Sequence, residues 1–288
     1  MAVYVGLDIG GTKLMAAAAD GQGEVIRRSP RRATPLGLED GLALLNRMVQ
    51  EVAGDEPIAA MGAAIGGPLD WRTGVVSPLH QVNWRGVPLK AEMEGRWGCP
   101  FYVDVDTNVA ALGEYHWGLD KPQRFLYVTI STGMGGGFLI AGQVYRGMNG
   151  EHPEIGHQAI AYVCSNPGAI QCECGVRDCL EALVSGNAIR RIYGKAAEDL
   201  EERQWAEVTY NLAQGLRNLM AIYLPDVIVL GGGVATGRGE RLIADIKRIL
   251  ATCVRIVPVS EVRLSALGYD TALRGSIVIA MQGLQQPY

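Results

Sequence analysis

The sequence predicts an α/β protein made of two halves that repeat the element order β-β-β-α-β-α. Short apolar runs typical of strands alternate with segments in which apolar residues recur at helical spacing. Two of the strand-like runs, Ala2–Ile9 and Phe125–Ser131, open the halves, and each ends in a glycine-rich turn. Glycine supplies 38 of the 288 residues, about 13% against an average near 7%. Such a chain uses glycine at turns and at close backbone contacts.

The first half begins with three expected strands, and Gly21 and Gly23 mark the turn between the second and the third. Leu38–Val52 has apolar residues at helical spacing. Ile58–Ile65 is apolar and is predicted as a buried strand that ends at Gly66-Gly67-Pro68. In order, the expected elements are strands at Ala2–Ile9, Lys13–Ala19 and Glu24–Ala33, a helix at Leu38–Val52, a strand at Ile58–Ile65, a helix at Leu89–Trp97 and a strand at Phe101–Val105.

The second half repeats this order after the turn Thr132–Gly137. Gly142 is expected to join two hairpin strands, and Asp226–Leu230 is a strand that runs into Gly231-Gly232-Gly233. The remaining expected elements are strands at Phe138–Ala141 and Gln143–Arg146, helices near Leu180–Tyr193 and Trp205–Leu224, a helix at Gly239–Cys253, a strand at Glu261–Ser265 and a helix at Thr271–Gln282.

We expect a smaller domain at residues 1–112 and a larger one at 113–275, with a terminal helix at about 276–288 that packs back on the first domain. A cleft between the domains is the default place for a ligand. The net charge of −4 argues against a nucleic-acid partner, which calls for a basic surface. No signal peptide or membrane span is recognisable, so we expect a cytoplasmic protein without a membrane partner.

The turn Asp8-Ile9-Gly10-Gly11-Thr12-Lys13 can serve as a phosphate site. Glycine lets backbone N–H groups approach an anion, Thr12 adds a hydroxyl, and Asp8 can hold Mg²⁺. An ordinary hairpin turn is the alternative interpretation, which the similar turn at Ser131–Gly137 makes weaker. Neither the P-loop motif nor the Rossmann glycine motif occurs.

These segments resemble a known nucleotide-binding scaffold. Asp8–Lys13, Ser131–Gly137 and Val227–Val234 are similar to the phosphate-1, phosphate-2 and adenosine elements of the actin-like ATPase superfamily, and within it to the ROK family of kinases and repressors. The resemblance runs from about Val3 to Ala280. It implies the two-domain actin-like (RNase H-like) fold with ATP and Mg²⁺ as cofactors. The residues it places at the nucleotide are Asp8, Gly10, Gly11, Thr12, Thr132, Gly133, Gly135, Gly136, Gly231, Gly232 and Gly233.

Three of the six cysteines fall within eight residues, which favours a metal site over disulfides. The segment Cys172–Cys179 reads C-x-C-G-x₃-C, and three thiolates need a fourth ligand to complete a tetrahedral zinc site. The family pattern, G-E-I-G-H followed by C-x-C-G-x₂-G-C-x-E, implies a structural zinc on His157, Cys172, Cys174 and Cys179. Asp178 stands where the family has glycine. Cys164 is a competing ligand outside the motif.

The segment Val103–Glu114 resembles the family's V-x-N-D-A-N-x-A-A-x-G-E, whose aspartate is the general base. The aspartate of that pattern corresponds to Asp106. Capping of the following helix is an alternative or additional role for Asp106. Val105 replaces the family's asparagine, so one contact to a sugar hydroxyl is missing. Asn83 is a candidate replacement, with an ordinary loop residue as the alternative.

Further sugar contacts are carried over by motif. They are Gly67, Glu154, His157 and Glu181, together with Asp106 itself. Gly66-Gly67-Pro68 stands where the family more often has Pro-Gly-Pro. Glu181 could instead complement a helix dipole as an N-terminal acid.

The expected function is therefore ATP-dependent phosphorylation of a hexose hydroxyl, at O6, with glucose as the first candidate. N-acetylmannosamine, fructose, and a modified sugar or cyclitol are alternative acceptors, and Val105 favours the last group. The chain reaches Asp8 without a winged-helix segment, which favours a kinase over a non-catalytic sugar-sensing regulator. The family resemblance implies a homodimer. A phosphoryl donor other than ATP, such as polyphosphate, stays open.

Overall fold

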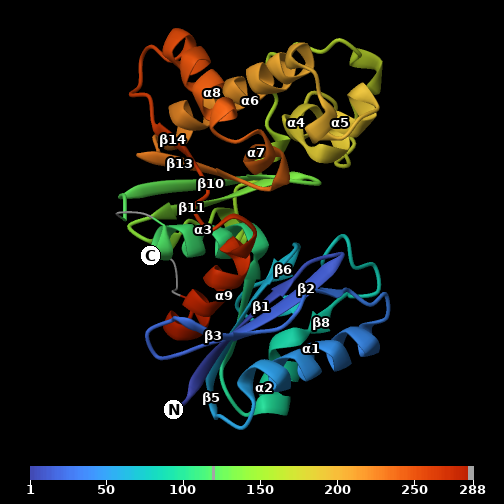
Figure 1. Ribbon diagram of the computed structural model, residues 1–288, viewed down its shortest axis with the longest axis vertical. Coiled ribbons are helices and arrows are strands. Elements are labelled where there is room, and N and C mark those ends of the chain that lie inside the picture. The colour runs from blue at the N-terminus through green and yellow to red at the C-terminus, as the bar shows by residue number, and fades with distance from the viewer. Residues whose placement is uncertain (119–120, 285–288) are drawn as a thin grey trace. The chain divides into compact units, whose positions relative to one another are not determined.

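The computed structural model describes residues 1–118 and 121–284. The chain forms two compact units, Met1–Leu119 together with Tyr269–Tyr288, and Asp120–Gly268 (Figure 1). The first unit extends past the boundary expected at residue 112 because helix α3 (Asp106–Trp117) continues to Trp117. The terminal helix expected at about 276–288 is α9 (Thr271–Gln282). Residues 285–288 of that expectation lie outside the described residues.

The first unit is built on a sheet with the strand order β3-β2-β1-β5-β9, in which β4 also pairs with β2. The pairs β1–β2 and β2–β3 are antiparallel, whereas β1–β5 and β5–β9 are parallel. The strands are β1 (Val3–Ile9), β2 (Lys13–Ala19), β3 (Val25–Arg28), β4 (Arg32–Ala33), β5 (Ile58–Ile65) and β9 (Phe101–Val105).

The single strand expected at Glu24–Ala33 is wrong, because the chain is interrupted between β3 and β4. Pro30 cannot donate to a strand ladder. The Ser29 hydroxyl accepts a hydrogen bond from the Ala16 N–H at 2.9 Å, so a side chain takes over one backbone pairing at this point.

Helices cover both faces of this sheet (Figure 1). Leu14, Ala16 and Ala18 of β2 pack in the same core as α1 (Leu38–Ala53) and α2 (Leu89–Trp97). The alternating residues Met15, Ala17 and Ala19 pack against Leu273 and Ile277 of α9. The period of two along the strand thus sorts its side chains between two apolar layers. A separate small sheet of β6 (Leu69–Asp70), β7 (Val75–Val76) and β8 (Val87–Pro88) contributes Val76 and Val87 to the core that α1 and α2 share with β2.

The second unit repeats the strand order of the first as β12-β11-β10-β13-β14, again with two antiparallel pairs followed by two parallel ones. This confirms the predicted repeat. The strands are β10 (Arg124–Ile130), β11 (Met134–Ile140), β12 (Gln143–Val144), β13 (Val227–Gly231) and β14 (Glu261–Leu264). β11 begins four residues before the strand expected at Phe138, inside the glycine run.

The helix expected near Leu180–Tyr193 is divided into α4 (Glu181–Val184) and α5 (Gly186–Tyr193). Ser185 leaves the helical conformation and its hydroxyl accepts from the Ala188 N–H at 3.2 Å, which caps α5. The other helices of this unit are α6 (Glu202–Tyr223), α7 (Gly233–Arg238) and α8 (Glu240–Cys253), with 3-10 turns at Met148–Gly150, Ile155–His157, Pro167–Ala169 and Ala197–Asp199; a further 3-10 turn at Gly268–Asp270 precedes α9. None of the described helices is long and apolar enough to cross a bilayer.

Candidate active site and metal centre

The carboxyl ends of three parallel neighbours, β1, β5 and β9, meet at one edge of the first sheet. Ile9 lies opposite Ile65, and Ile65 lies opposite Val105. Asp8 is the penultimate residue of β1, and Asp106 directly follows β9. The two aspartates expected to bear the chemistry in this unit are therefore brought to the same edge by strand pairing.

The electrostatics of Asp8 reflect this position. Burial and, to a lesser extent, the negative charge of Asp106 raise the pKa of Asp8 from 3.8 to about 7, against a smaller opposing effect of Arg31. A cation near Asp8 would favour its ionised form. Arg31 had no place in the motif analysis, because its contact with this edge arises from a separate segment of chain.

Asp106 is the first residue of α3 and is exposed, with Val105 in the N-cap position. Its Oδ1 accepts a hydrogen bond from the Thr107 N–H at 2.8 Å. The carboxylate thus satisfies one of the free amides of the helix start, as the capping alternative suggested, although from the position after the cap. Behind it, the fully buried Asp104 accepts from the Val105 N–H at 2.7 Å and from Asn108 Nδ2 at 3.3 Å.

The first glycine turn is fastened mainly through Gly10. Its N–H donates to the Lys13 carbonyl at 3.0 Å, and its carbonyl accepts from Thr34 Oγ1 at 2.7 Å and from Gln81 Nε2 at 3.4 Å. Gly11 and Thr12 are exposed. The turn therefore presents Gly11 and Thr12 to solvent, held by Thr34 and Gln81, two residues that the motifs did not reveal.

Two expected sugar contacts of this unit have identified partners. The Gly67 carbonyl accepts from the Leu79 N–H at 3.0 Å, and Asn83 Nδ2 donates to the Leu36 carbonyl at 2.7 Å. The amide nitrogen of Asn83 is thus engaged within the protein. A Cβ at Gly67 would lie 3.8 Å from Val105 Cγ2, which places Gly67 next to the position where the family pattern loses its asparagine.

The second glycine turn is shorter than expected. It comprises Ser131–Gly133, closed by a 2.9 Å bond from the Ser131 N–H to the Gly133 carbonyl. Gly135 and Gly136 lie instead within β11, opposite Thr129 and Val128. The buried Gly136 has a packing reason to be glycine, because a Cβ there would lie 2.7 Å from the Tyr127 carbonyl.

The third glycine stretch joins β13 to α7. Gly231 ends the strand, Gly232 has φ +83° in the N-cap position, and Gly233 begins the helix. Its positive φ favours glycine at position 232. The stretch forms a strand-to-helix turn, and the helix α7 that follows it was not expected from the sequence.

His157, Cys172, Cys174 and Cys179 come together in the second unit, with ligand atoms all within 4.8 Å of one another. Cys172 Sγ lies 3.4 Å from His157 Nδ1, and Cys174 Sγ lies 3.6 Å from Cys179 Sγ. The histidine segment is held to the cysteine loop by a bond from the Leu180 N–H to the Gln158 carbonyl at 3.0 Å.

This donor set fits zinc. A tetrahedral site with usual zinc–ligand lengths separates two sulfurs by about 3.8 Å and a sulfur from a nitrogen by about 3.6 Å, close to the observed spacings. Burial raises the pKa of Cys179 to about 12 and raises that of Cys172, whereas a hydrogen bond with the Val176 backbone lowers that of Cys174. Metal binding must therefore release protons.

Asp178 keeps the backbone shape that glycine would give. Its φ is +71°, in the left-handed region, which aspartate tolerates better than most residues. Its carboxylate interacts with the Tyr162 hydroxyl and contributes, after burial, to a raised Tyr162 pKa. The substitution thus leaves the ligand loop in place.

Of the other expected sugar contacts in this unit, Glu181 approaches the metal ligands with its side chain, whereas Glu154 contacts His157 through its backbone carbonyl, which accepts from the His157 N–H at 3.0 Å. Glu181 Oε2 is 3.6 Å from His157 Nδ1. The exposed Glu154 precedes the 3-10 turn that carries His157, and its Oε1 is 3.4 Å from His152 Nε2.

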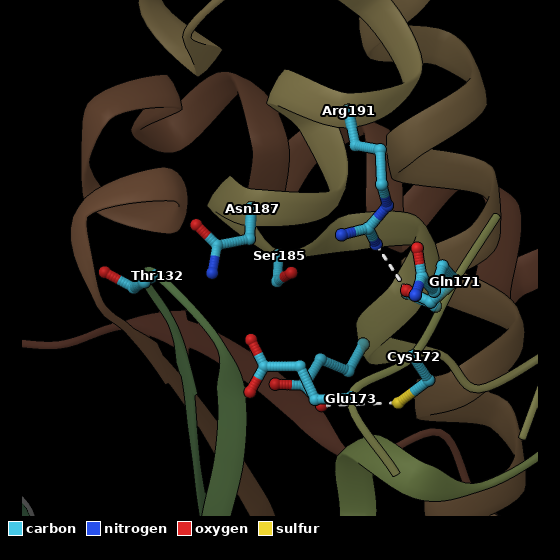
Figure 2. Close-up of a pocket in the computed structure, with 9 residues that line it drawn as sticks. Thr132, Gln171, Cys172, Glu173, Ser185, Asn187 and Arg191 are labelled. Carbon is cyan, nitrogen blue, oxygen red and sulfur yellow. Dashed lines mark hydrogen bonds between the residues drawn. The ribbon is translucent and has the colours of Figure 1, made fainter. Parts of the chain in front are cut away.

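A pocket open to solvent lies between the second glycine turn and the cysteine loop. Figure 2 shows Thr132, Ser185 and Asn187 on one side of it and Glu173 on another. Its complete lining is Thr132, Gln171, Cys172, Glu173, Glu181, Ala182, Ser185, Asn187 and Arg191. The pocket is polar, and Glu181 belongs both to its wall and to the surroundings of the metal ligands.

Comparison with known proteins gives a consistent result. The family model described as the ROK family matches residues 4–283. A glucokinase from Halalkalibacterium halodurans is 29% identical over 94% of this chain and 93% of its own. A ROK hexokinase from Thermus thermophilus has a similar structure, with a TM-score of 0.82, 31% identity, and coverage of 97% of this chain and 98% of that one. A ROK glucokinase from Streptomyces griseus, solved with glucose and AMPPNP, gives a TM-score of 0.79, 26% identity, and coverage of 98% and 100%.

Proposed function

This chain belongs to the ROK family, and from that membership we propose that it is an ATP-dependent sugar kinase that phosphorylates a hexose hydroxyl at O6. The observation that carries the proposal is the exposed carboxylate of Asp106, beside Asp8 at the carboxyl edge of the first sheet. The similarity to a glucokinase, and to a structure solved with glucose and AMPPNP, supports a sugar and ATP as substrates.

In this proposal Asp106 is the general base. Its carboxylate accepts the proton of the attacking hydroxyl while the hydroxyl oxygen forms a bond to the γ-phosphorus of ATP. The bond from that phosphorus to the bridging oxygen breaks, and ADP leaves. The Thr107 N–H holds one oxygen of the carboxylate at 2.8 Å, which orients the base toward its substrate.

The glycine turns are the proposed phosphate sites. Gly11 and Thr12 of the first turn and Thr132 of the second are exposed, so they can contact phosphate oxygens, whereas Gly10, Gly133, Gly135 and Gly136 shape these segments. Gly231–Gly233 would lie against the adenosine. Asp8 would hold Mg²⁺, a hard cation that prefers carboxylate oxygens and neutralises charge on the phosphates during transfer.

We assign zinc to His157, Cys172, Cys174 and Cys179, in a structural role. The four protein ligands leave no position for a reactive water. Bound zinc would hold the His157 segment and the cysteine loop in one arrangement. Because the three thiols must stay reduced to bind it, and ATP must be available, we place the protein in the cytoplasm; a homodimer is the proposed assembly.

Glucose is the first candidate acceptor, with contacts from Gly67, Glu154, His157 and Glu181. Val105 can neither donate nor accept a hydrogen bond through its side chain, and the Asn83 amide nitrogen already bonds Leu36. The sugar position facing Val105 therefore needs no hydroxyl. N-acetylmannosamine, fructose, and a modified sugar or cyclitol remain the other acceptors.

A panel of sugars and cyclitols with Mg-ATP tests the function, with ADP formation as the measurement. At least one acceptor should give turnover. Asp106→Asn should lower turnover by about 10²–10⁴-fold, the usual contribution of a general base, and should leave sugar affinity within about tenfold. Asp55→Asn, an exposed carboxylate of the same unit, is the control. Sugar binding without ADP formation by any acceptor would identify a sensor instead. Unimpaired turnover in Asp106→Asn would show that Asp106 is not the general base.

A further inference from the structure

Glu181 connects the metal ligands to the second glycine turn. Its Oε1 accepts a hydrogen bond from the Met134 N–H at 3.0 Å, directly after the turn Ser131–Gly133. Its Oε2 lies 3.6 Å from His157 Nδ1 and 3.8 Å from Cys172 Sγ. One carboxylate therefore spans the distance between the two features.

The turn also packs tightly on this carboxylate. A Cβ at Gly133 would lie only 2.6 Å from Glu181 Oε1, and a Cβ at Gly156 would lie 2.7 Å from the Met134 carbonyl. Larger residues at these two positions would push Glu181 or the turn away. The close approach is thus a built feature of this part of the fold.

The segment that begins at Glu181 holds the other side of the turn as well. The Gly186 N–H donates to the Ser131 carbonyl at 2.7 Å, and the Asn187 N–H donates to the Thr132 carbonyl at 3.1 Å. Figure 2 shows Asn187 and Thr132 near each other at one end of the pocket. Three residues of the segment 181–187 therefore hydrogen-bond two positions of the turn, Ser131 and Thr132, and the strand residue Met134 after it.

The backbone of Glu181 is fixed by the ligand loop itself. The Leu180 N–H bonds Gln158, next to His157, and the Ala182 N–H bonds the Cys179 carbonyl at 3.0 Å. Any change in the ligand loop is transmitted directly to Glu181. A continuous series of contacts thus links His157 and Cys179, through Glu181, to Met134.

We propose that Glu181 is a positioning residue for the nucleotide, through which occupancy of the metal site sets the conformation of the Ser131–Gly133 turn and hence the affinity for ATP phosphates. This rests on the proposed function, and it adds a nucleotide role to a residue otherwise assigned to the sugar. Metal and nucleotide binding are then thermodynamically coupled.

Isothermal titration calorimetry with Mg-AMPPNP in the absence of sugar separates this role from a sugar contact. The protein used carries one zinc per chain. Glu181→Ala should weaken binding by about tenfold, the factor expected for one hydrogen bond to a charged group. Glu181→Gln, whose amide oxygen can still accept from Met134, should stay within about threefold. Glu173→Ala, which removes another carboxylate from the same pocket, should stay within about twofold.

Coupling is tested by removing the metal. Metal-free wild type should bind Mg-AMPPNP more weakly by the same factor as zinc-loaded Glu181→Ala. Removing the metal from Glu181→Ala should weaken binding no further, because both changes break the same connection. If metal removal and Glu181→Ala each weaken Mg-AMPPNP binding independently, so that their factors multiply in the metal-free variant, the proposal is overturned. Glu181→Asp, one methylene shorter, replaces alanine if that variant does not fold, with the same loss expected.

Cobalt(II) in place of zinc gives a readout that does not depend on a folded metal-free protein. AMPPNP should shift the visible cobalt absorption of wild type and leave that of Glu181→Ala unchanged. An unchanged wild-type spectrum would overturn the proposal. A working kinase in which Glu181→Ala raises only the KM for sugar would also overturn it while leaving the proposed function intact; failure of wild type to bind AMPPNP or form ADP would contradict the function itself.

Discussion

Asp8 illustrates how the role proposed for one residue at the nucleotide can reduce stability. Its carboxyl lies at a mostly apolar strand end, where burial and the charge of Asp106 raise its pKa to about 7. The folded chain therefore prefers the neutral acid, whereas the unfolded chain ionises near pH 4. The nucleotide-free protein thus loses stability as the pH rises from about 4 to about 7.

Asp8→Asn should raise the melting temperature of the nucleotide-free protein at pH 8 and have little effect at pH 5. At pH 8 the wild type buries a charge that the amide lacks, and at pH 5 both side chains are neutral. Thermal unfolding followed by circular dichroism measures this, with Asp55→Asn as the exposed control. The same variant should have a lower rate of ADP formation with Mg-ATP. A stabilisation equal at both pH values would contradict the assigned cause.

The residues that the sequence revealed are those with a chemical signature. The spacing of Cys172, Cys174 and Cys179 pointed to a metal, and the structure brings them together with His157. Thr34, Gln81 and the Met134 N–H carried no such signal. They act through backbone groups or through contacts between distant segments, which a linear motif does not record.

At the scale of elements, α9 packs unusually closely on the first sheet and on α3. Glycine makes this possible on both sides: a Cβ on Gly62 of β5 would overlap the Ser276 carbonyl, and one on Gly275 of α9 would overlap the Val109 carbonyl. These glycines keep the helix close enough to bury Leu273, Ile277 and the strand residues beneath them.

Gly275→Ala should lower the free energy of unfolding by about 2–3 kcal/mol, since the new methyl group has no room. Gly95→Ala in α2 is the matched control. A Cβ there meets nothing within 4 Å, so the higher helix propensity of alanine should stabilise the protein by about 0.5–1 kcal/mol. Urea unfolding of both variants gives the two values. A neutral Gly275→Ala would show that α9 can move away at no cost.

Element types were predicted more accurately than element ends. Short apolar runs identified β1, β2, β5 and β9, and apolar residues at helical spacing identified the long helices. The break at Ser29-Pro30, the short helix α4 and the start of β11 at Met134 depend on local hydrogen bonds, on the Ser185 cap and on pairing with β10. Periodicity within one segment carries no information on such partners.

At the scale of the whole molecule, the two units differ in how they are assembled from the chain. The second is continuous, whereas the first needs a segment from each end of the sequence. Without α9, the face of the first sheet that carries Met15, Ala17 and Ala19 would lose the apolar residues that cover it.

A chain that ends at residue 268 should therefore keep a protected second unit and lose protection in the first. Hydrogen exchange with mass spectrometry would show fast exchange in β1, β2 and β5 and slow exchange in β10 and β13. Adding a peptide of residues 269–284 should restore part of the protection. Slow exchange in β5 of the shortened chain would mean that the first sheet is stable without α9.

The return of α9 to the first sheet also has a consequence in time. During synthesis the strands of the first unit leave the ribosome before α9, and about 150 residues separate them. At roughly 5–20 residues per second this interval lasts roughly 8–30 s. The second unit can complete its fold while the nascent first sheet still waits with an uncovered apolar face. The part of the protein that is made first is the last to be finished, and during that delay its uncovered apolar face can associate with other chains.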